Sequence, residues 1–264
     1  DINIQKLEPS FLNDFDFFLR TKANINNNSA VKHTKNLSKI LKICYHNNWI
    51  EKDLVIFYKG RFNEVNVNFL TDEELSSIRE KEFSGKGLEL VRDMFVFSCY
   101  TGLAYIDIFN LTKDQLSKGI DGNLWIITNR QKTGSASNIP LLPVAEEIIK
   151  KYENHPVSSN SGKLLPVYTN QKVNEYLKTI AENCGINKKL TFHCARHTFA
   201  TTVTLGNNVS MESVSKMLGH KSIKTTQHYA KILDSKVSQD MGSLKLVLEK
   251  KNEVQKENDK KLGS

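Results

Sequence analysis

The sequence predicts a mainly α-helical protein with a small β-sheet or hairpin, organised in two domains. Apolar residues recur with a helical period through most of the 264-residue chain. Two β-rich runs flank a polar turn between residues 123 and 142, which predicts a hairpin. Residues 58–69 lose the helical period and carry a glycine and several asparagines, so we place a linker at 61–69. The chain is long enough for each domain to bury a core.

The first domain is expected at residues 1–60, with helical periodicity from residue 10 to about 58. One side of its second half is apolar and is formed by Leu37, Ile40, Leu41 and Cys44. The opposite side is basic and is formed by Lys32, Lys35, Lys39 and Lys42. Between residues 17 and 50 there are six basic residues and no acidic one, whereas an ordinary solvated surface mixes both signs. We therefore favour a helix that follows DNA phosphates, and a plain amphipathic surface helix is the alternative.

The second domain is expected at residues 70–242. Thr71, followed three residues later by Glu74, predicts the start of a helix with a capping box. The next helix has apolar residues at helical spacing and is expected to end at Gly102. The hairpin follows, with Lys132 at its tip. Further helices are expected at about 143–155, 170–184, 193–206, 210–218 and 222–233.

Residues 243–264 are expected to form a charged tail. Leu244, Val247 and Leu248 make a short apolar stripe in it, which is typical of a helix that docks onto a neighbouring copy of the chain. The chain begins with Asp1 rather than Met and ends in Lys-Leu-Gly-Ser, a pattern typical of a trimmed chain. An N-terminal arm-binding domain is one segment that such trimming removes.

The composition narrows the class of protein. With 37 Lys and Arg against 29 Asp and Glu, the net charge of +8 favours a polyanionic partner. No apolar run approaches the roughly 18 residues of a membrane span, and no signal peptide opens the chain. The four cysteines are widely separated among apolar residues, which argues against a disulfide framework or a zinc site. We therefore expect a cytoplasmic protein that does not bind a membrane.

The strongest chemical signal is the stretch Thr-Phe-His-Cys-Ala-Arg-His. His193 and Arg196 are three residues apart in it, so on a helix they project from one side and can share one ligand. Downstream come His220 and, nine residues later, Tyr229. Each of these residues alone is more often structural, but guanidinium, imidazole, phenol and the hairpin lysine together suit a phosphodiester. The carboxylate clusters of a two-metal nuclease are missing, so we expect no metal and no cofactor.

The segments HCARHTFAT and LGHKSIKTTQHYA, preceded by CYTGLAYIDI and RQKTGSASNIPL, resemble the four signature boxes of the tyrosine recombinases, or phage-type integrases. The resemblance covers residues 65–240, and the basic helices before the linker resemble the core-binding, SAM-like domain of that family. The TGLAYID form is similar to integrases of mobile elements in Bacteroides-like bacteria. The resemblance implies a bacterial enzyme that integrates or excises such an element. Its implied partners are double-stranded recombination sites, further copies of the chain in a dimer to tetramer, and accessory DNA-bending proteins.

The resemblance also implies a role for each residue of the constellation. Tyr229 is the nucleophile, which attacks the scissile phosphate to give a 3′-phosphotyrosyl link and a free 5′-hydroxyl, so that strands are exchanged without ATP. Arg196 and His193 bind the non-bridging oxygens of that phosphate. His220 bonds to the same phosphate, and Lys132 protonates the leaving 5′-oxygen.

Ala104 departs from the family's pattern, which has its first catalytic arginine directly after Thr-Gly-Leu. A methyl group does not bind phosphate, so the alanine is an engineered change, or the cation comes from elsewhere, or the protein is catalytically impaired. We favour Arg92 on the preceding helix, whose guanidinium can reach inward over a buried neighbour. Arg130 on the hairpin, which we also expect to contact DNA, is the other candidate. Asp107 and His197 are expected to support the catalytic residues without touching the phosphate.

Two rival functions are compatible with the same residues. One is a DNA-binding protein that has kept the fold but lost cleavage through Ala104. The other is a type IB topoisomerase, which uses the same chemistry but needs no assembly with partners. The apolar stripe in the tail favours a recombinase, because it provides a means of assembly.

Overall fold

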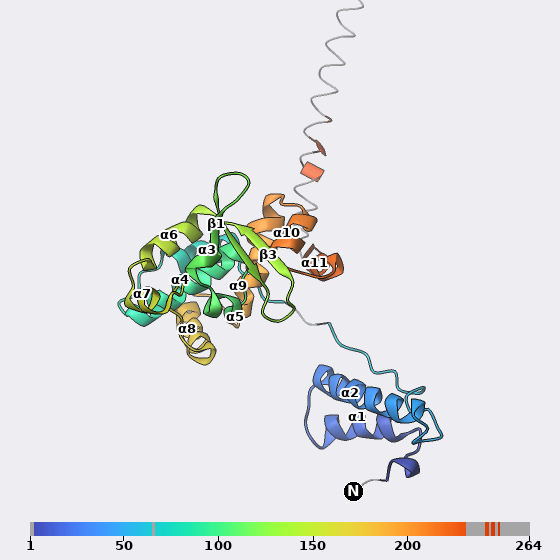
Figure 1. Cartoon of the computed structure of the whole chain (residues 1–264). Coiled ribbons are helices and arrows are strands. Elements are labelled where there is room, and N and C mark those ends of the chain that lie inside the picture. The colour runs from blue at the N-terminus through green and yellow to red at the C-terminus, as the bar shows by residue number, and fades with distance from the viewer. Residues whose placement is uncertain (1–2, 65–66, 231–240, 243, 246–247, 249–264) are drawn as a thin grey trace, which may run out of the picture. The chain divides into compact units, whose positions relative to one another are not determined.

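The chain folds into two compact units, Asp1–Asn66 and Val67–Ser264 (Figure 1). The computed structural model describes residues 3–64, 67–230, 241–242, 244–245 and 248. In the expected tail, Leu244 and Leu248 are 47% and 50% exposed, whereas Val247 lies outside the described residues. Among the described helices, none is both long enough and apolar enough to cross a lipid bilayer.

The first unit is built on two helices, α1 (Phe11–Thr21) and α2 (Asn27–His46), after a short 3-10 turn, η1 (Ile4–Lys6). The helix α2 begins where the side chain of Asn26 accepts a hydrogen bond from the backbone N–H of Ser29. The buried core of this unit is formed by Leu12, Leu41, Cys44, Ile50 and Leu54.

Two expectations for this unit are wrong in detail. The helix predicted to continue to about residue 58 ends at His46, and Asn48 adopts a left-handed backbone with φ of 55° just after it. Ile40, predicted on the apolar side, is 58% exposed, whereas Leu41 and Cys44 are buried. The four lysines of the predicted basic side are exposed along α2. A ligand that follows this helix would therefore meet lysines with isoleucine beside them.

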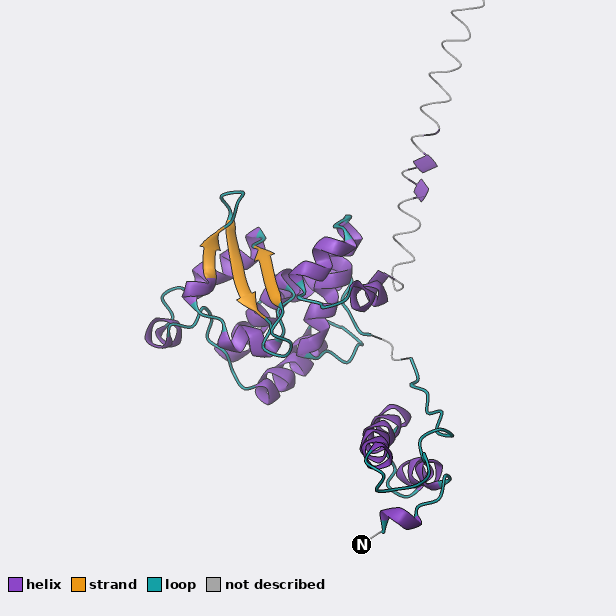
Figure 2. Cartoon of the chain, turned by 45° about the vertical axis from the view of Figure 1, so that its right-hand side comes forward, coloured by secondary structure: helices purple, strands orange, loops and turns teal. Residues whose placement is uncertain are grey.

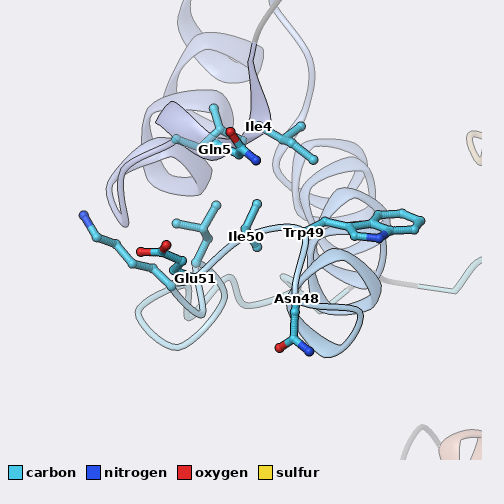
Figure 3. A pocket seen from close by; sticks show the side chains of 9 residues that line it. Ile4, Gln5, Asn48, Trp49, Ile50 and Glu51 are labelled. Carbon is cyan, nitrogen blue, oxygen red and sulfur yellow. The ribbon is translucent and has the colours of Figure 1, made fainter.

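A hollow of about 260 Å³ lies in the first unit, between η1 and the loop after α2 (Figure 3). Ile4 and Trp49 line it and are both exposed, and the lining contains no histidine and no cysteine. Its lysine, Lys52, lies 3.3 Å from the carboxylate of Glu8. The hollow therefore offers no imidazole or thiol, and its lysine lies beside a carboxylate.

The second unit contains the sheet and most of the helices (Figure 2). The helices are α3 (Asp72–Glu80), α4 (Lys86–Thr101), α5 (Tyr105–Asn110), α6 (Pro143–Tyr152), α7 (Pro156–Ser161), α8 (Asn170–Asn183), α9 (Phe192–Thr198), α10 (Met211–Met217) and α11 (Ile223–Ala230). Two 3-10 turns, η2 (Lys113–Gln115) and η4 (Leu205–Asn207), and one π-helical turn, η3 (Phe199–Thr204), lie between them. The helix α4 packs against α3, α6, α8 and α9 and is the centre of the core.

The ends of α3 and α4 follow the sequence signals. The Thr71 hydroxyl accepts from the backbone N–H of Glu74, and the Glu74 carboxylate accepts from the backbone N–H of Thr71, so the predicted capping box is confirmed. The helix α4 ends at Gly102, as predicted, in a left-handed conformation with φ of 69°. The short helices α5 and α7 were not predicted, because six residues are too few to show a helical period.

Three antiparallel strands form the sheet, in the order β1 (Leu116–Lys118), β2 (Leu124–Asn129), β3 (Ala136–Pro140). The strands β2 and β3 are the predicted hairpin, and Ile126 pairs with Ile139 in the buried face. The strand β1 was missed, since three residues are too short to show alternation. The predicted fold class, mainly α with a small sheet, is confirmed. Because β3 packs against α10, the hairpin is held beside the last helices of the described chain (Figure 1).

Candidate active site

The helix α9 carries His193, Arg196 and His197 on one side, because positions three and four residues apart are neighbours on a helix. The rings of the two histidines meet edge to face, with centroids 4.3 Å apart. The π-helical turn η3 follows directly, a local irregularity that is frequent at functional sites. Within it, the hydroxyl of Thr201 donates to the carbonyl of His197 at 2.8 Å and fixes the end of α9.

The guanidinium of Arg196 is held by backbone groups. The residue is 4% exposed, and its Nη1 donates to the carbonyl of Gly102 at 2.6 Å. Its Nη2 donates to the carbonyl of Leu218 at 2.5 Å and lies 3.2 Å from Nε2 of His220. Since Gly102 closes α4 and Leu218 closes α10, this arginine ties α9 to the ends of two other helices.

Both ring nitrogens of His220 have partners. Because a guanidinium only donates, Nε2 of His220 accepts from Arg196. The Nδ1 atom then carries the proton and donates to the hydroxyl of Thr226 at 2.9 Å. Gly219, just before it, has φ of 60°, and a Cβ there would lie 2.7 Å from Cγ of Arg130. The Leu-Gly-His turn therefore requires glycine where the hairpin passes.

The helix α11 brings Tyr229 into the same place. The residue is 6% exposed, and its Oη lies 3.2 Å from Nδ1 of His197. Its ring is nearly parallel to that of His220, with centroids 6.3 Å apart. The structure thus gathers the predicted nucleophile, Arg196 and two of the predicted histidines in one cluster of contacting side chains.

Arg130 enters this pocket from the end of β2. Its Nη1 donates at 3.0 Å to the carbonyl of Leu218, which also accepts from Arg196. Its Nε lies 2.8 Å from Oδ2 of Asp107, in an ion pair whose N–H is not aligned for a hydrogen bond. The other oxygen of Asp107 accepts from the backbone N–H of Gln131 at 3.0 Å. The carboxylate therefore holds the hairpin and its arginine in position.

Arg92 does not reach the pocket, so our favoured source of the replacement cation is wrong. Its Nε lies 2.5 Å from the carboxylate of Asp93, and its Nη1 donates to the carbonyls of Arg79 and Lys81. The buried aspartate draws the guanidinium to the side of α4 that faces α3 and α6. Arg130, the second candidate, is the cation that the fold brings beside the active-site helix.

Lys132 and His193 lie on the open side of the site. Both are exposed, Lys132 in the turn between β2 and β3 and His193 on α9. The His193 ring is desolvated where it packs against His197, and this desolvation, then Arg196 and further positive charges that include Lys132, lowers the pKa of His193. Ala104 and His193 line an open hollow of about 440 Å³. A longer side chain at position 104 would therefore find room beside this histidine.

The two inner histidines are neutral at pH 7. Burial, followed by the charge of Arg196, lowers the pKa of His220 to about 4. Burial, followed by the neighbouring His193 and then Arg196, lowers the pKa of His197 to about 4. Each of these rings can therefore accept a proton or a hydrogen bond at one nitrogen while it donates at the other.

The phenol and the guanidinium respond to burial in opposite ways. Burial raises the pKa of Tyr229, and the charges of Arg196 and Arg130 partly oppose that rise. Burial, followed by repulsion from Arg130, lowers the pKa of Arg196 to about 10. Tyr229 is therefore protonated and Arg196 charged at neutral pH.

Three groups of the site were missed by the sequence analysis: the carbonyls of Gly102 and Leu218, and the hydroxyl of Thr226. A backbone carbonyl leaves no mark in a sequence. Thr226 is fully buried and lies three residues before Tyr229, on the same side of α11. That spacing is a usable signal, since a hydroxyl one turn before the tyrosine has to face the same pocket.

Two family models match this chain. Residues 68–236 match the phage integrase family, and residues 1–60 match the phage integrase SAM-like domain. The tyrosine recombinase XerC of Rickettsia canadensis is 29% identical over 170 residues, which are 60% of this chain and 50% of that protein. The tyrosine recombinase XerD of Lacticaseibacillus casei is 30% identical over 172 residues, which are 61% of this chain and 57% of that protein. The chain thus spans about half the length of the curated relatives it matches.

Solved structures share the fold. A lambda integrase dimer bound to a COC′ core site has a TM-score of 0.68 at 17% identity, and the match covers 87% of this chain and 81% of that one. The Tn1549 transposon integrase in complex with circular intermediate DNA has a TM-score of 0.67 at 15% identity, over 86% of this chain and 82% of that one. With the larger match covering more than half of the sequence, this chain belongs to the phage integrase family of tyrosine recombinases.

Proposed function

We propose that this protein is a site-specific DNA recombinase that cleaves and rejoins strands through a 3′-phosphotyrosine link at Tyr229, without metal ions or ATP. One observation carries the proposal: a buried tyrosine lies in one cluster with the buried guanidinium of Arg196 and the largely buried one of Arg130, which donate to the same carbonyl. A nucleophile beside preorganised cations suits attack on a phosphodiester, where negative charge is stabilised as the new bond forms.

Arg196 is the principal phosphate ligand in this proposal. Its bonds to Gly102, Leu218 and His220 use three of the five N–H donors of a guanidinium and fix its plane before DNA arrives. The remaining donors bind the non-bridging oxygens. Arg130 supplies the second cation in place of the arginine that is missing at Ala104.

The other residues act around that clamp. His193 bonds to a phosphate oxygen, and Lys132 gives a proton to the leaving 5′-oxygen. His220 bonds to the same phosphate once its Nδ1–H turns from Thr226 to a phosphate oxygen. The exposed position of Lys132 on a hairpin turn allows it to approach a strand that lies over the site. Asp107 keeps Arg130 oriented and does not touch DNA.

The substrate is double-stranded DNA that carries recombination sites. Support comes from the net charge of +8 and the exposed lysines of α2, which we propose follow the phosphate backbone. The lambda and Tn1549 integrases were solved bound to DNA, the lambda protein as a dimer. We extend this to assembly of two to four copies of the present chain, with accessory DNA-bending proteins. The setting is the bacterial cytoplasm, where the protein integrates or excises a mobile element similar to those of Bacteroides-like bacteria.

The test is a trapped covalent complex. A pool of nicked duplexes with random sequence around the nick is incubated with the protein, and denaturant-resistant adducts are isolated and sequenced at the junction. We expect adducts from the parent protein and none from Tyr229→Phe, which lacks the nucleophilic oxygen but binds the same DNA. Adducts that persist in the phenylalanine variant would show that another residue attacks.

A second function, DNA binding without cleavage, is favoured by Ala104 itself. If it is correct, the parent forms no adduct on any duplex, whereas Ala104→Arg forms one at Tyr229. Equal DNA affinity of the two proteins would then show that the parent protein is defective in DNA cleavage and not in DNA binding.

A further inference from the structure

We propose that His197 is a catalytic residue that takes the proton of Tyr229 as this tyrosine attacks DNA, an inference that rests on the proposed function. Its Nδ1 lies 3.2 Å from Oη of Tyr229, within reach of a direct proton transfer. Sequence resemblance gives His197 only a supporting role, whereas the geometry points to contact with the reacting oxygen itself.

Two other basic groups of the site are already engaged, and His193 packs against the ring of His197 without a hydrogen bond to Tyr229. His220 accepts from Arg196 at one nitrogen and donates to Thr226 at the other, so it has no lone pair for the phenol. The carboxylate of Asp107 is paired with the hairpin arginine. Within residues 3–64 and 67–230, the hydrogen bond to Oη comes from His197.

The protonation states of Tyr229 and His197 before the reaction allow transfer of the proton from the phenol to the imidazole. Burial raises the pKa of Tyr229 and lowers that of His197 to about 4, so before attack the phenol is protonated and the imidazole is neutral. In the tautomer with its proton on Nε2, the ring accepts from Oη at Nδ1. His193 and Arg196 are among the charges that disfavour the protonated ring of His197. A bound phosphate places negative charge beside these groups and makes the ring more basic at the moment of attack.

The backbone around His197 holds its ring on this oxygen. The carbonyl of His197 accepts from Thr201 in the π-helical turn, and the ring of His193 packs edge-on against it. The ring centroids of His197 and Tyr229 are 5.5 Å apart and the planes are tilted by 52°. An imidazole that already contacts the phenol and packs against His193 needs little rearrangement to receive the proton.

The step is balanced as follows. As Oη bonds to phosphorus, its proton passes to Nδ1 of His197, which becomes an imidazolium. The bond from phosphorus to the 5′-oxygen breaks, and this oxygen takes a proton from Lys132. In religation the 5′-hydroxyl returns its proton to Lys132, and His197 returns its proton to Oη.

The experiment compares His197→Asn with His197→Ala in single-turnover formation of the covalent complex. An asparagine keeps a hydrogen-bonding atom near the position of Nδ1 but does not take up a proton. If His197 is the proton acceptor, both variants lose about a hundredfold or more in rate, as for the loss of a general base, with unchanged DNA affinity. Added imidazole is expected to restore part of the rate of His197→Ala.

A second substrate distinguishes deprotonation of the nucleophile from protonation of the leaving group. It carries sulfur in place of the bridging 5′-oxygen, so its leaving group departs without a proton. We expect this substrate to rescue Lys132→Ala but neither His197 variant. Parental rates in His197→Asn would overturn the proposal and leave His197 a positioning residue, and rescue by sulfur would move its role to the leaving group.

The outcome also separates this inference from the proposed function. If the parent forms adducts that Tyr229→Phe does not, the function stands, and the His197 variants decide the inference alone. If the parent forms none on any duplex, both fail. Circular dichroism and DNA affinity check folding, and His197→Asn, the smaller change, serves if the alanine variant is unfolded.

Discussion

Arg130 is the residue whose proposed role the structure changed most. A test of this role has to change Arg130 together with its partner Asp107. Its side chain is 10% exposed and that of Asp107 only 1%, so Arg130→Ala alone would leave a buried carboxylate without its cation. Breaking a buried pair in this way lowers the free energy of unfolding by about 3–5 kcal/mol. A slower reaction of that variant could then come from partial unfolding and not from the loss of the guanidinium. The double variant Arg130→Met with Asp107→Asn removes both charges at nearly constant volume. Its stability should therefore stay close to that of the parent.

The chemical effect of this double variant follows from what the guanidinium does. In the proposed function it is one preformed donor beside the scissile phosphate, and loss of one such donor lowers the rate by about 10²–10³, or ~2.7–4 kcal/mol. The assay is the single-turnover rate of covalent complex formation on a nicked duplex at saturating protein. Adding Ala104→Arg to the double variant should recover part of this loss, because the hollow beside Ala104 has room for the longer side chain.

Arg92→Ala is the matched control, since it removes another largely buried arginine. Asp93 keeps hydrogen bonds from Lys151 and Tyr152, so the protein should fold with reduced stability. Its rate of cleavage should equal that of the parent. The reasoning is refuted if the double variant cleaves at the parental rate, or if Arg92→Ala loses as much as the double variant does.

Three further predictions concern binding, packing and pH. Replacing Lys35 and Lys39 by alanine should weaken binding to specific and random duplexes alike and flatten the slope of log affinity against log salt by up to about 2. An unchanged slope would mean that the lysine side of α2 faces solvent in the complex. Gly219→Ala should lower the free energy of unfolding by more than about 1 kcal/mol and slow cleavage, because its Cβ would lie 2.7 Å from the side chain of the hairpin arginine. Gly122→Ala, with φ of 76° but nothing within 4 Å, is the control that has only the backbone strain. The pKa of His220 falls from 6.5 to about 4 on folding, so the unfolded chain takes up the proton first as the pH falls. The free energy of unfolding therefore decreases between these two pH values. Urea unfolding at pH 7 and pH 5 should show a smaller decrease in His220→Gln than in the parent protein.

The sequence predicted the helices and the clustering of the candidate site residues better than the backbone contacts that join them. The capping box at Thr71 and the glycine end at Gly102 are local signals, and both were found where expected. The clustering of Tyr229 with Arg196 was predicted by resemblance, because spacing alone does not bring two helices together. Arg92 failed since a pattern of apolar neighbours does not show that a buried Asp93 will capture the guanidinium first.

Another part of the site is invisible in the sequence for a physical reason. The carbonyls of Gly102 and Leu218 hold Arg196, and every residue has a carbonyl. Which one is left unpaired depends on where a helix ends, and helix ends are set by packing as well as by sequence. The carbonyl of Leu218 matters because it accepts from two arginines at once, a relation that exists only after β3 has packed against α10.

The partners of Arg196 support the proposal that an anion binds at this site. Arg130 is balanced by Asp107, but the groups that accept from Arg196 are two carbonyls and an imidazole, all without charge. A guanidinium that is 4% exposed and bound only by neutral groups is held at a cost, and the pKa of Arg196, lowered to about 10, reflects that cost. Of the described residues, none forms an ion pair with it. A bound phosphate would supply the missing negative charge beside Arg196. Binding would then offset the free-energy cost of burying this guanidinium without a charged partner and would stabilise the folded protein.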